Sequence, residues 1–368
     1  EVISLAALGN DLYSGKTSLP FIAKRRIWYT IAIVVIALSA VLVVKPGLNP
    51  GIDFKGGSEV TVTGVADPSE GPGNDVLADK DLSSGSSVTT MGASSVRIQT
   101  NELDKAQLDE LASSLATAYD VDSGSVSATT IGPTWSADVT SKAARGLVIF
   151  FLLVGALIWI YFRTWKMAAA ALLALSHDII VTIGIYAASG FEVTPATIIG
   201  VLTILGYSLY DTVVVFDKIR ENTSHYEAQT RSTYAELANL AVNQTFIRSI
   251  NTSVVGVLPV ASLLVVGAFI LGAGTLRDIA LTLFIGMIAG TLSSIFLATP
   301  LLVDLRSREK SIVEQAKRVE AARAQRVTQA GDDDEALAAI VAAPAASPLV
   351  PGHHLGVSAQ PKRKNRRS

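Results

Sequence analysis

Six long apolar runs alternate with polar stretches along the chain and determine its predicted architecture. Each run approaches the length of about twenty apolar residues that a helix needs to cross a bilayer. The runs are 27–45, 143–162, 167–188, 196–216, 246–271 and 279–302. We therefore predict an α-helical integral membrane protein with six transmembrane helices, of which helices 2 to 6 occupy 139–304.

The polar stretch 46–138, between the first two runs, carries the patterns of a small folded domain. Three segments alternate apolar and polar residues as half-buried strands do: 59–63, 94–100 and 125–131. Asn101 can cap a helix whose apolar face consists of Leu108, Leu111, Leu115 and Tyr119. The strands and the helix predict an α+β domain, whereas 67–92, rich in Gly, Ser and Asp, is interpreted as a flexible insertion.

Basic residues predict how the chain is oriented in the membrane. Three of them, at 24–26, directly precede the first run, which predicts a cytoplasmic N-terminal segment, 1–26, and an extracytoplasmic α+β domain. An even number of spans returns the charged tail, 305–368, to the cytoplasm. Three basic residues fall on the outer side and weaken this rule: Lys142, Arg145 and Arg277.

Composition agrees with a membrane protein and excludes several classes of chemistry. Hydrophobic residues make up 49% of the chain and charged residues 17%, and the mean hydropathy is +0.43. The absence of cysteine excludes disulfides, thiolate metal sites and thiol nucleophiles. The motifs of nucleotide hydrolysis and of the familiar hydrolases are also absent. We therefore expect no enzyme, no catalytic residue, no metal and no cofactor.

Local signals predict where some helices begin and how they pack. Thr194, followed by a proline, is typical of an N-cap and predicts the start of the fourth span. Thr233 and Glu236 resemble a capping box and predict a short helix on the inner surface before the fifth span. Gly286 and Gly290 form a G-x-x-x-G pair, which lets another helix of this chain or of a partner approach closely.

Asp211 lies inside the fourth apolar run, where a carboxylate costs at least ~2.5 kcal/mol unless it faces protein or water. If the hydrocarbon ends near Phe216, a rise of roughly 1.5 Å per residue puts Asp211 about 8 Å below the cytoplasmic surface. Asp217 then lies at the interface. Two interpretations remain open: a carboxylate that a neighbouring helix satisfies for packing alone, or a carrier of protons or ions.

Arg248 lies in the fifth run at a depth similar to that of Asp211. It either extends to the lipid headgroups or pairs with Asp211, and a pair that forms and breaks would couple proton passage to movement. In the third run, Ser176, His177 and Asp178 are adjacent. Because adjacent helical residues point in different directions, they do not form a catalytic triad, and we interpret them as a polar cluster for helix contacts or a proton path.

Five motifs, in order along the chain, resemble those of the SecF family, the smaller membrane subunits of bacterial SecDF complexes. They are GIDFKGG at 51–57, IGP at 131–133, SHD at 176–178, YSLYDTVVVFDKIREN at 207–222 and RSINTS at 248–253. The resemblance covers 24–308. It implies the resistance-nodulation-division architecture, in which six helices pair with six of SecD, and a ferredoxin-like domain between helices 1 and 2.

The resemblance also implies a function driven by the proton-motive force: movement of the outer domains would pull unfolded preproteins outward after SecA and the SecYEG channel have started them across. It assigns the proton path to Asp211 and Arg248, to which we add Asp217, Asp178 and His177 as candidates. The family-motif residues are Asp53, Gly56, Gly57, Arg220, Glu221 and Asn222. Tyr210 departs from the family pattern, in which a smaller polar residue is common.

The expected setting is a bacterial cell membrane, with SecD, SecYEG, SecA, preproteins and lipid as partners and no specific nucleic acid. One alternative is a half-size proton-driven exporter of solutes or lipids in the same superfamily, and another is a scaffold without a transport cycle. The tail from residue 305 onward is interpreted as a charged helix to about Val327 and then a solvated disordered segment. Lipid headgroups and ribosomal RNA are alternative targets of that segment, and His353 and His354 are interpreted as incidental.

Overall fold

The computed structural model describes residues 5–267 and 274–330. The chain divides into two compact units. One consists of Ala23–Asp217 and Arg248–Arg306 and contains the membrane helices and a β-sheet; the other consists of the described parts of Glu1–Ile22, Lys218–Ile247 and Ser307–Ser368. The predicted tail beyond residue 330, with His353 and His354, lies outside the described residues.

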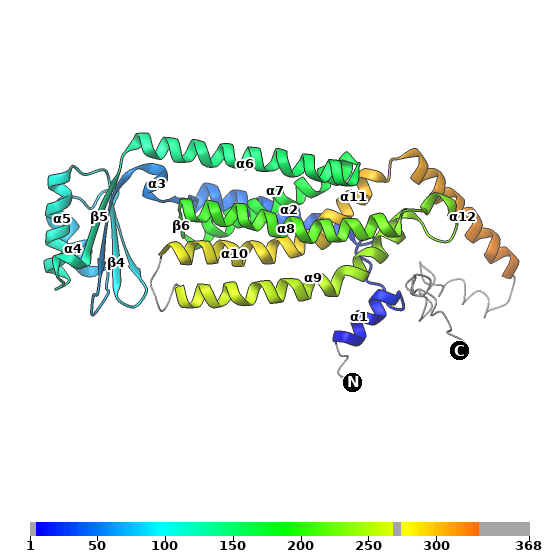
Figure 1. Ribbon diagram of the computed structural model, residues 1–368, viewed down its shortest axis with the longest axis horizontal. Helices are drawn as coiled ribbons and strands as arrows, with labels where there is room; N and C mark the ends of the chain where they lie inside the picture. The colour runs from blue at the N-terminus through cyan, green and yellow to red at the C-terminus, as the bar shows by residue number, and fades with distance from the viewer. Residues whose placement is uncertain (1–4, 268–273, 331–368) are drawn as a thin grey trace, which may run out of the picture. The chain divides into compact units, whose positions relative to one another are not determined.

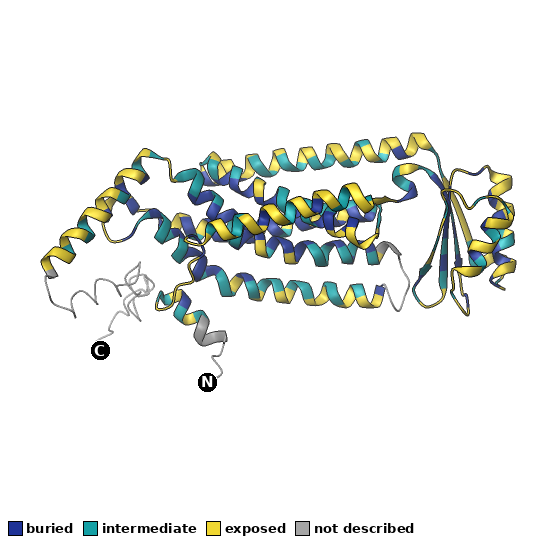
Figure 2. Cartoon of the chain, turned by 180° about the vertical axis from the view of Figure 1, so that it is seen from behind, coloured by how far each residue is buried: buried dark blue, intermediate teal, exposed yellow. Residues whose placement is uncertain are grey.

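Six helices are long and apolar enough to cross a membrane, which confirms the predicted number of spans. They include α2 (Arg25–Leu42), α6 (Pro133–Phe162), α7 (Trp165–Ser189), α8 (Pro195–Asn222), α9 (Tyr234–Val265) and α10 (Gly274–Ser293), which continues through η5 (Ser294–Ala298) into α11 (Thr299–Arg306). The long helices run side by side (Figure 1). Within the most apolar window, 6% of residues are buried in α6 but 56% in the last span, so α6 is peripheral (Figure 2).

A four-stranded antiparallel sheet lies in the chain between α2 and α6. Its strands are β2 (Gly57–Thr63), β3 (Ser87–Met91), β4 (Ser95–Thr100) and β5 (Val126–Ile131), in the spatial order β3-β4-β2-β5. Helices α4 (Gly71–Asp79) and α5 (Lys105–Ala118) lie on the side away from the long helices (Figure 1). Val60 and Val62 pack with the predicted face of α5, because the alternation in β2 turns them toward the helices.

Two predictions for this region are wrong. The segment 67–92 is not a structureless insertion, since it forms α4 and β3 and buries Leu77 in the core. Its Gly-rich and Ser-rich composition obscures the few apolar residues that pack in the core, Val76, Leu77 and Val88. The cap of α5 is Asp104 rather than Asn101: its side chain accepts from the backbone N–H of Gln107, whose side chain accepts from the N–H of Asp104.

A turn between the short helix α3 (Ile52–Lys55) and β2 requires two glycines. Gly56 has a φ of 78° and Gly57 a φ of 141°, which residues with a Cβ rarely adopt. A Cβ on Gly57 would also lie 2.5 Å from the carbonyl oxygen of Thr100 on β4. The predicted family-motif glycines therefore let the chain turn from the membrane segment directly into the sheet.

Small residues allow α10 to contact α8 closely. A Cβ on Gly286 would overlap the side chain of Ile204, and a Cβ on Gly290 would lie 2.7 Å from the Cβ of Ser208. Of the two alternatives left open for this glycine pair, the structure supports packing within the chain.

The second unit contains α1 (Leu5–Ser14), η3 (Tyr226–Ala228) and α12 (Lys310–Ala330). Thr233 and Glu236 form the predicted capping box, but the predicted short helix is wrong, because α9 continues from it without a break to Val265. Arg323 of α12 contacts Glu236 at 2.7 Å. The charged stretch after the last span is helical, as predicted.

Candidate functional site

Asp211 is buried among three helices and bonded to two hydroxyl groups. It lies on α8 with 7% of its surface exposed. The Oγ atom of Ser249, on α9, donates to one carboxylate oxygen at 2.6 Å, and that of Ser294, in η5, to the other at 2.5 Å. Both acceptor atoms of Asp211 are thereby satisfied, which a carboxylate at this depth requires.

A second buried acid continues the polar cluster along α8. Asp178 of α7 is 1% exposed and accepts a 2.7 Å hydrogen bond from Ser208. Its other oxygen lies 3.3 Å from Nδ1 of His177. Ser208 is three residues before Asp211, so the two lie on one face of α8. We call Asp178, Ser208, Asp211, Ser249 and Ser294 the bundle cluster.

Arg248 does not belong to the bundle cluster. Its side chain is exposed, and its Nη2 donates to the hydroxyl of Tyr210 at 3.3 Å. In the part of the chain that the structure describes, no ion pair joins Arg248 to Asp211. The predicted pairing is therefore absent from this arrangement, because Ser249 rather than its neighbour Arg248 makes the α9 contact with Asp211.

The remaining candidates on α8 lie outside the bundle cluster as well. Asp217 is exposed and accepts a 3.4 Å hydrogen bond from Tyr161. Glu221 pairs with Lys218 at 2.9 Å, and Asn222 donates to Gln244 at 3.0 Å. Arg220 is exposed too. These residues fix the end of α8 rather than contact Asp211.

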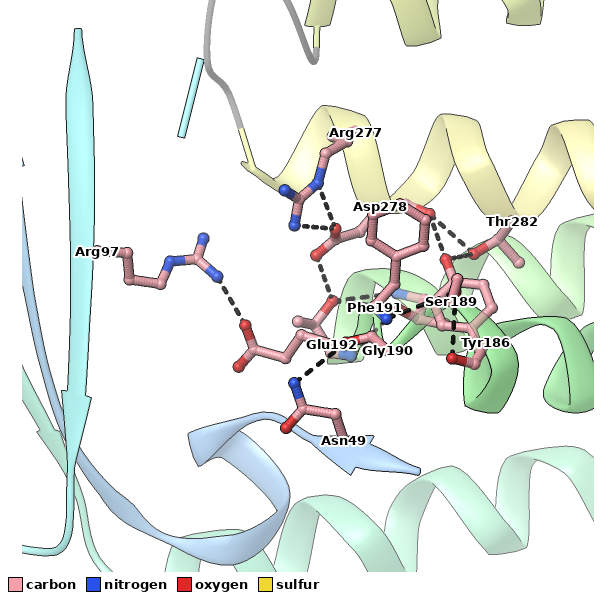
Figure 3. Close-up of polar contacts among 12 residues, drawn as sticks. Asn49, Arg97, Tyr186, Ser189, Gly190, Phe191, Glu192, Arg277, Asp278 and Thr282 are labelled. Atoms are coloured by element: carbon pink, nitrogen blue, oxygen red, sulfur yellow. Dashed lines mark hydrogen bonds and ion pairs between the residues drawn. The ribbon is translucent and has the colours of Figure 1, made fainter. Parts of the chain in front are cut away.

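A second polar cluster joins the sheet to the membrane helices (Figure 3). Glu192, in β6 (Glu192–Val193), accepts from Arg97 at 2.8 Å and from Gln99 at 2.7 Å, both on β4. Glu59 of β2 accepts from the same Gln99 at 3.0 Å. We call these four residues the junction cluster. Sequence reasoning missed it, although the alternation of β4 turns Arg97 away from the core residues Val96 and Ile98.

Neighbouring contacts reinforce the junction. Strand β6 pairs in parallel with β1 (Asn49–Pro50), directly before the glycine turn. Asp278 of α10 accepts from Arg277 at 3.2 Å and from Thr194, the predicted N-cap of α8, at 3.1 Å. The hydroxyl of Thr194 also accepts from the N–H of Thr197, which confirms that cap.

Asp53 lies near Glu59 and Glu192, the two acids of the junction cluster. Burial raises the pKa of this half-buried carboxyl above its ordinary value, and the charges of Glu59 and Glu192 add to the rise. The folded protein therefore favours the protonated form of Asp53 more than the unfolded chain does.

The chemistry available in the bundle cluster is proton exchange. Hydroxyl groups both donate and accept, so they can bond to a carboxylate and to a protonated carboxyl alike. Within the described ranges, no group of three His, Asp or Glu residues could hold a metal ion.

Two family models match this chain. Residues 111–308 match the family described as protein export membrane protein SecD/SecF, C-terminal. Residues 41–64 match the SecD/SecF GG motif, which includes the glycine turn at Gly56 and Gly57.

Relatives cover most of the chain. It is 46% identical over 330 residues to the protein translocase subunit SecF of Streptomyces coelicolor, covering 87% of this chain and 86% of that protein. It is 42% identical over 322 residues to SecF of Mycobacterium tuberculosis, covering 84% and 72%. The crystal structure of SecDF, a translocon-associated membrane protein from Thermus thermophilus, superposes with a TM-score of 0.70 at 29% identity. The match covers 80% of this chain and spans 39% of that SecDF chain.

Proposed function

The chain belongs to the SecD/SecF family of protein-export membrane proteins, and from this premise we propose that it is a SecF-type subunit that uses the proton-motive force to promote late stages of preprotein translocation. The observation that carries the proposal is Asp211, a buried acid in a membrane span whose partners are two hydroxyls. Acids at such positions serve ion and proton paths in many membrane proteins. Asp178, which accepts from Ser208 on α8, and His177, which contacts Asp178 directly, extend the path.

We assign the protein to a bacterial cell membrane with both termini in the cytoplasm. The basic residues at 24–26, where α2 begins, support this orientation. The basic residues around the loops after α6 and after α8, which would then lie inside, support it as well. It puts the sheet domain outside the cytoplasm. The order of its elements, with strands β3-β4-β2-β5, supports a ferredoxin-like domain between the first and second spans.

SecD is the partner that we propose for the exposed side of α8 and α9. Arg248 and Tyr210 are exposed within membrane spans, where an arginine facing lipid costs at least ~2.5 kcal/mol. A second subunit would shield both. The likeness to a SecDF structure, over 39% of that chain, supports SecD as the partner. The SecYEG channel, SecA and unfolded preproteins would then act with that complex.

The test is export into membrane vesicles with an imposed proton gradient. Asp211→Asn keeps the shape of the side chain and removes its titration, so we expect gradient-driven export to fall to the level without a gradient. Asp138→Asn is the matched control, because it changes an exposed acid on another membrane helix, α6. Export by Asp211→Asn equal to that of the control would contradict proton carriage.

Co-purification separates this proposal from a half-size exporter and from a scaffold. A SecF-type subunit should retain SecD in both variants, whereas a homo-oligomeric exporter should retain only copies of itself. Retained SecD also shows that a loss of export in Asp211→Asn does not come from failed assembly.

A further inference from the structure

An apolar cavity of about 430 Å³ lies among the membrane helices, near the end that carries the sheet. Its volume falls within the range of about 300 to 1,000 Å³ that is common for ligand pockets. Pro50 of β1 and Val193 of β6 border it toward the sheet. The walls come from α6, α7 and α8, chiefly Ala143, Leu147, Ile179, Ile183, Val201 and Leu202.

The few polar groups of the lining are already hydrogen-bonded inside the protein. Thr140 and Thr182 each donate to a carbonyl four residues earlier, at 2.8 Å. Tyr186 is bonded to Thr282 at 2.6 Å, and Thr197 lies 3.3 Å from the hydroxyl of Thr194. The lining contains no charged residue. A ligand in this cavity therefore finds apolar contacts and no free hydrogen-bonding group.

The position of the cavity indicates which apolar ligand is available. All three wall helices are candidate membrane spans. Thr140, Ala143, Ala144 and Leu147 form one stripe of α6, while Ile149 and Leu152 on the same helix are 55% and 69% exposed, as lipid-facing residues are. The cavity is partly open and lies among candidate membrane spans, so the acyl chains of a bilayer are the apolar ligand expected beside it.

We propose that this cavity binds one acyl chain of a membrane phospholipid. A polypeptide segment is the less suitable occupant, because its N–H and C=O groups would be buried there without partners. Thr182 contacts the backbone of Asp178 in the bundle cluster, and Tyr186 contacts that of Asp278 near the junction. The bound chain thus fills the space between the two polar clusters and holds α6 against α7 and α8.

The experiment is photolabelling in vesicles of phosphatidylethanolamine and phosphatidylglycerol. The probe is a phosphatidylglycerol with a diazirine at the end of one acyl chain, and the target is the full-length chain in the complex that it forms. Mass spectrometry then maps the lipid adducts. Ala143→Trp fills the cavity from α6, and Val201→Phe fills it from α8. Ile149→Trp is the matched control, because it adds the same ring to the lipid-facing side of α6.

We expect adducts to concentrate on the lining of α6, α7 and α8. Each filling variant should lower them about tenfold, which corresponds to about 1.4 kcal/mol and to roughly two buried methylene groups. Ile149→Trp should leave them unchanged. If Ala143→Trp does not assemble, Val201→Phe decides. Equal labelling of both filling variants and the control would overturn the proposal. Adducts spread evenly over the exposed faces would overturn it too. So would preferential crosslinking of an unfolded preprotein to Ile183.

Discussion

Two acids of this protein, the partly buried Glu192 and the buried Asp211, differ in the partners that hold them. Glu192, in the junction cluster, accepts a hydrogen bond from the guanidinium of Arg97 at 2.8 Å. Asp211, in the bundle cluster, accepts only from Ser249 and Ser294 among the described residues. A guanidinium is always charged and can only donate, so it suits a permanently ionised carboxylate. Hydroxyls suit both states of an acid, which supports the proposal that Asp211 exchanges a proton, whereas the contacts of Glu192 tie the sheet to the membrane helices.

The largest effect on stability should come from removing the cation of the junction cluster. Arg97→Met leaves two acids, Glu192 and Glu59, without the cation that they share. Breaking such a largely buried pair should lower the free energy of unfolding by about 3 kcal/mol. Adding Glu192→Gln should recover part of this loss. Thermal unfolding of the purified protein measures both changes.

The matched control removes a cation from a pair at the surface. Lys142 pairs with Asp138 at 2.7 Å, but the two side chains are 72% and 54% exposed. Lys142→Met should therefore change stability by less than about 1 kcal/mol. Equal effects of the two substitutions would mean that the junction is no anchor.

A smaller effect, dependent on pH, is expected at Asp53 beside the junction. Burial raises the pKa of Asp53 above 3.8, so its contribution to stability is present below that value and is lost as the pH rises through the raised one. Asp53→Asn should therefore be more stable than the parent at neutral pH, by less than about 1 kcal/mol for this half-exposed group. The difference should disappear in acid. Unfolding curves across this range measure it, and a difference independent of pH would contradict the assignment.

The smallest expected effect is the coupling between Arg248 and Asp211. Because they share no hydrogen bond in this arrangement, their effects on thermal stability should add within about 0.5 kcal/mol. A double-mutant cycle with Arg248→Met and Asp211→Asn measures this coupling free energy. A larger coupling would mean that the ion pair predicted from the sequence forms in a substantial fraction of molecules.

Apolar run length and strand alternation were sufficient to predict the six spans and three of the four strands of the antiparallel sheet, since both depend on local patterns. The helices that carry Asp211 and Arg248 were also predictable, but the rotation of these helices was not. Neighbouring helical residues differ in direction by about 100°, and it is Ser249 rather than Arg248 that faces Asp211. Tertiary packing alone determines that rotation.

The junction cluster could not be predicted for a different reason. Arg97 and Glu192 are 95 residues apart in the sequence. Each resembles a charged residue exposed on a strand or in a loop, and the surrounding pattern indicates no partner. Helix α4 and strand β3 within 67–92 were missed because a short amphipathic helix and an edge strand have a composition that resembles that of a linker.

Infrared difference spectroscopy of the complex in lipid, recorded as the pH is changed, tests the contrast between the two acids most directly. A protonated carboxyl has a carbonyl stretching band that a carboxylate lacks. Because Asp53 and other acids also contribute to the pH-dependent carboxyl bands, we predict one component of these bands that is lost in Asp211→Asn and retained in Glu192→Gln and in Asp53→Asn. A carboxyl spectrum that Asp211→Asn leaves unchanged, or the same component lost in Glu192→Gln, would contradict the assignment of Asp211 as the proton carrier.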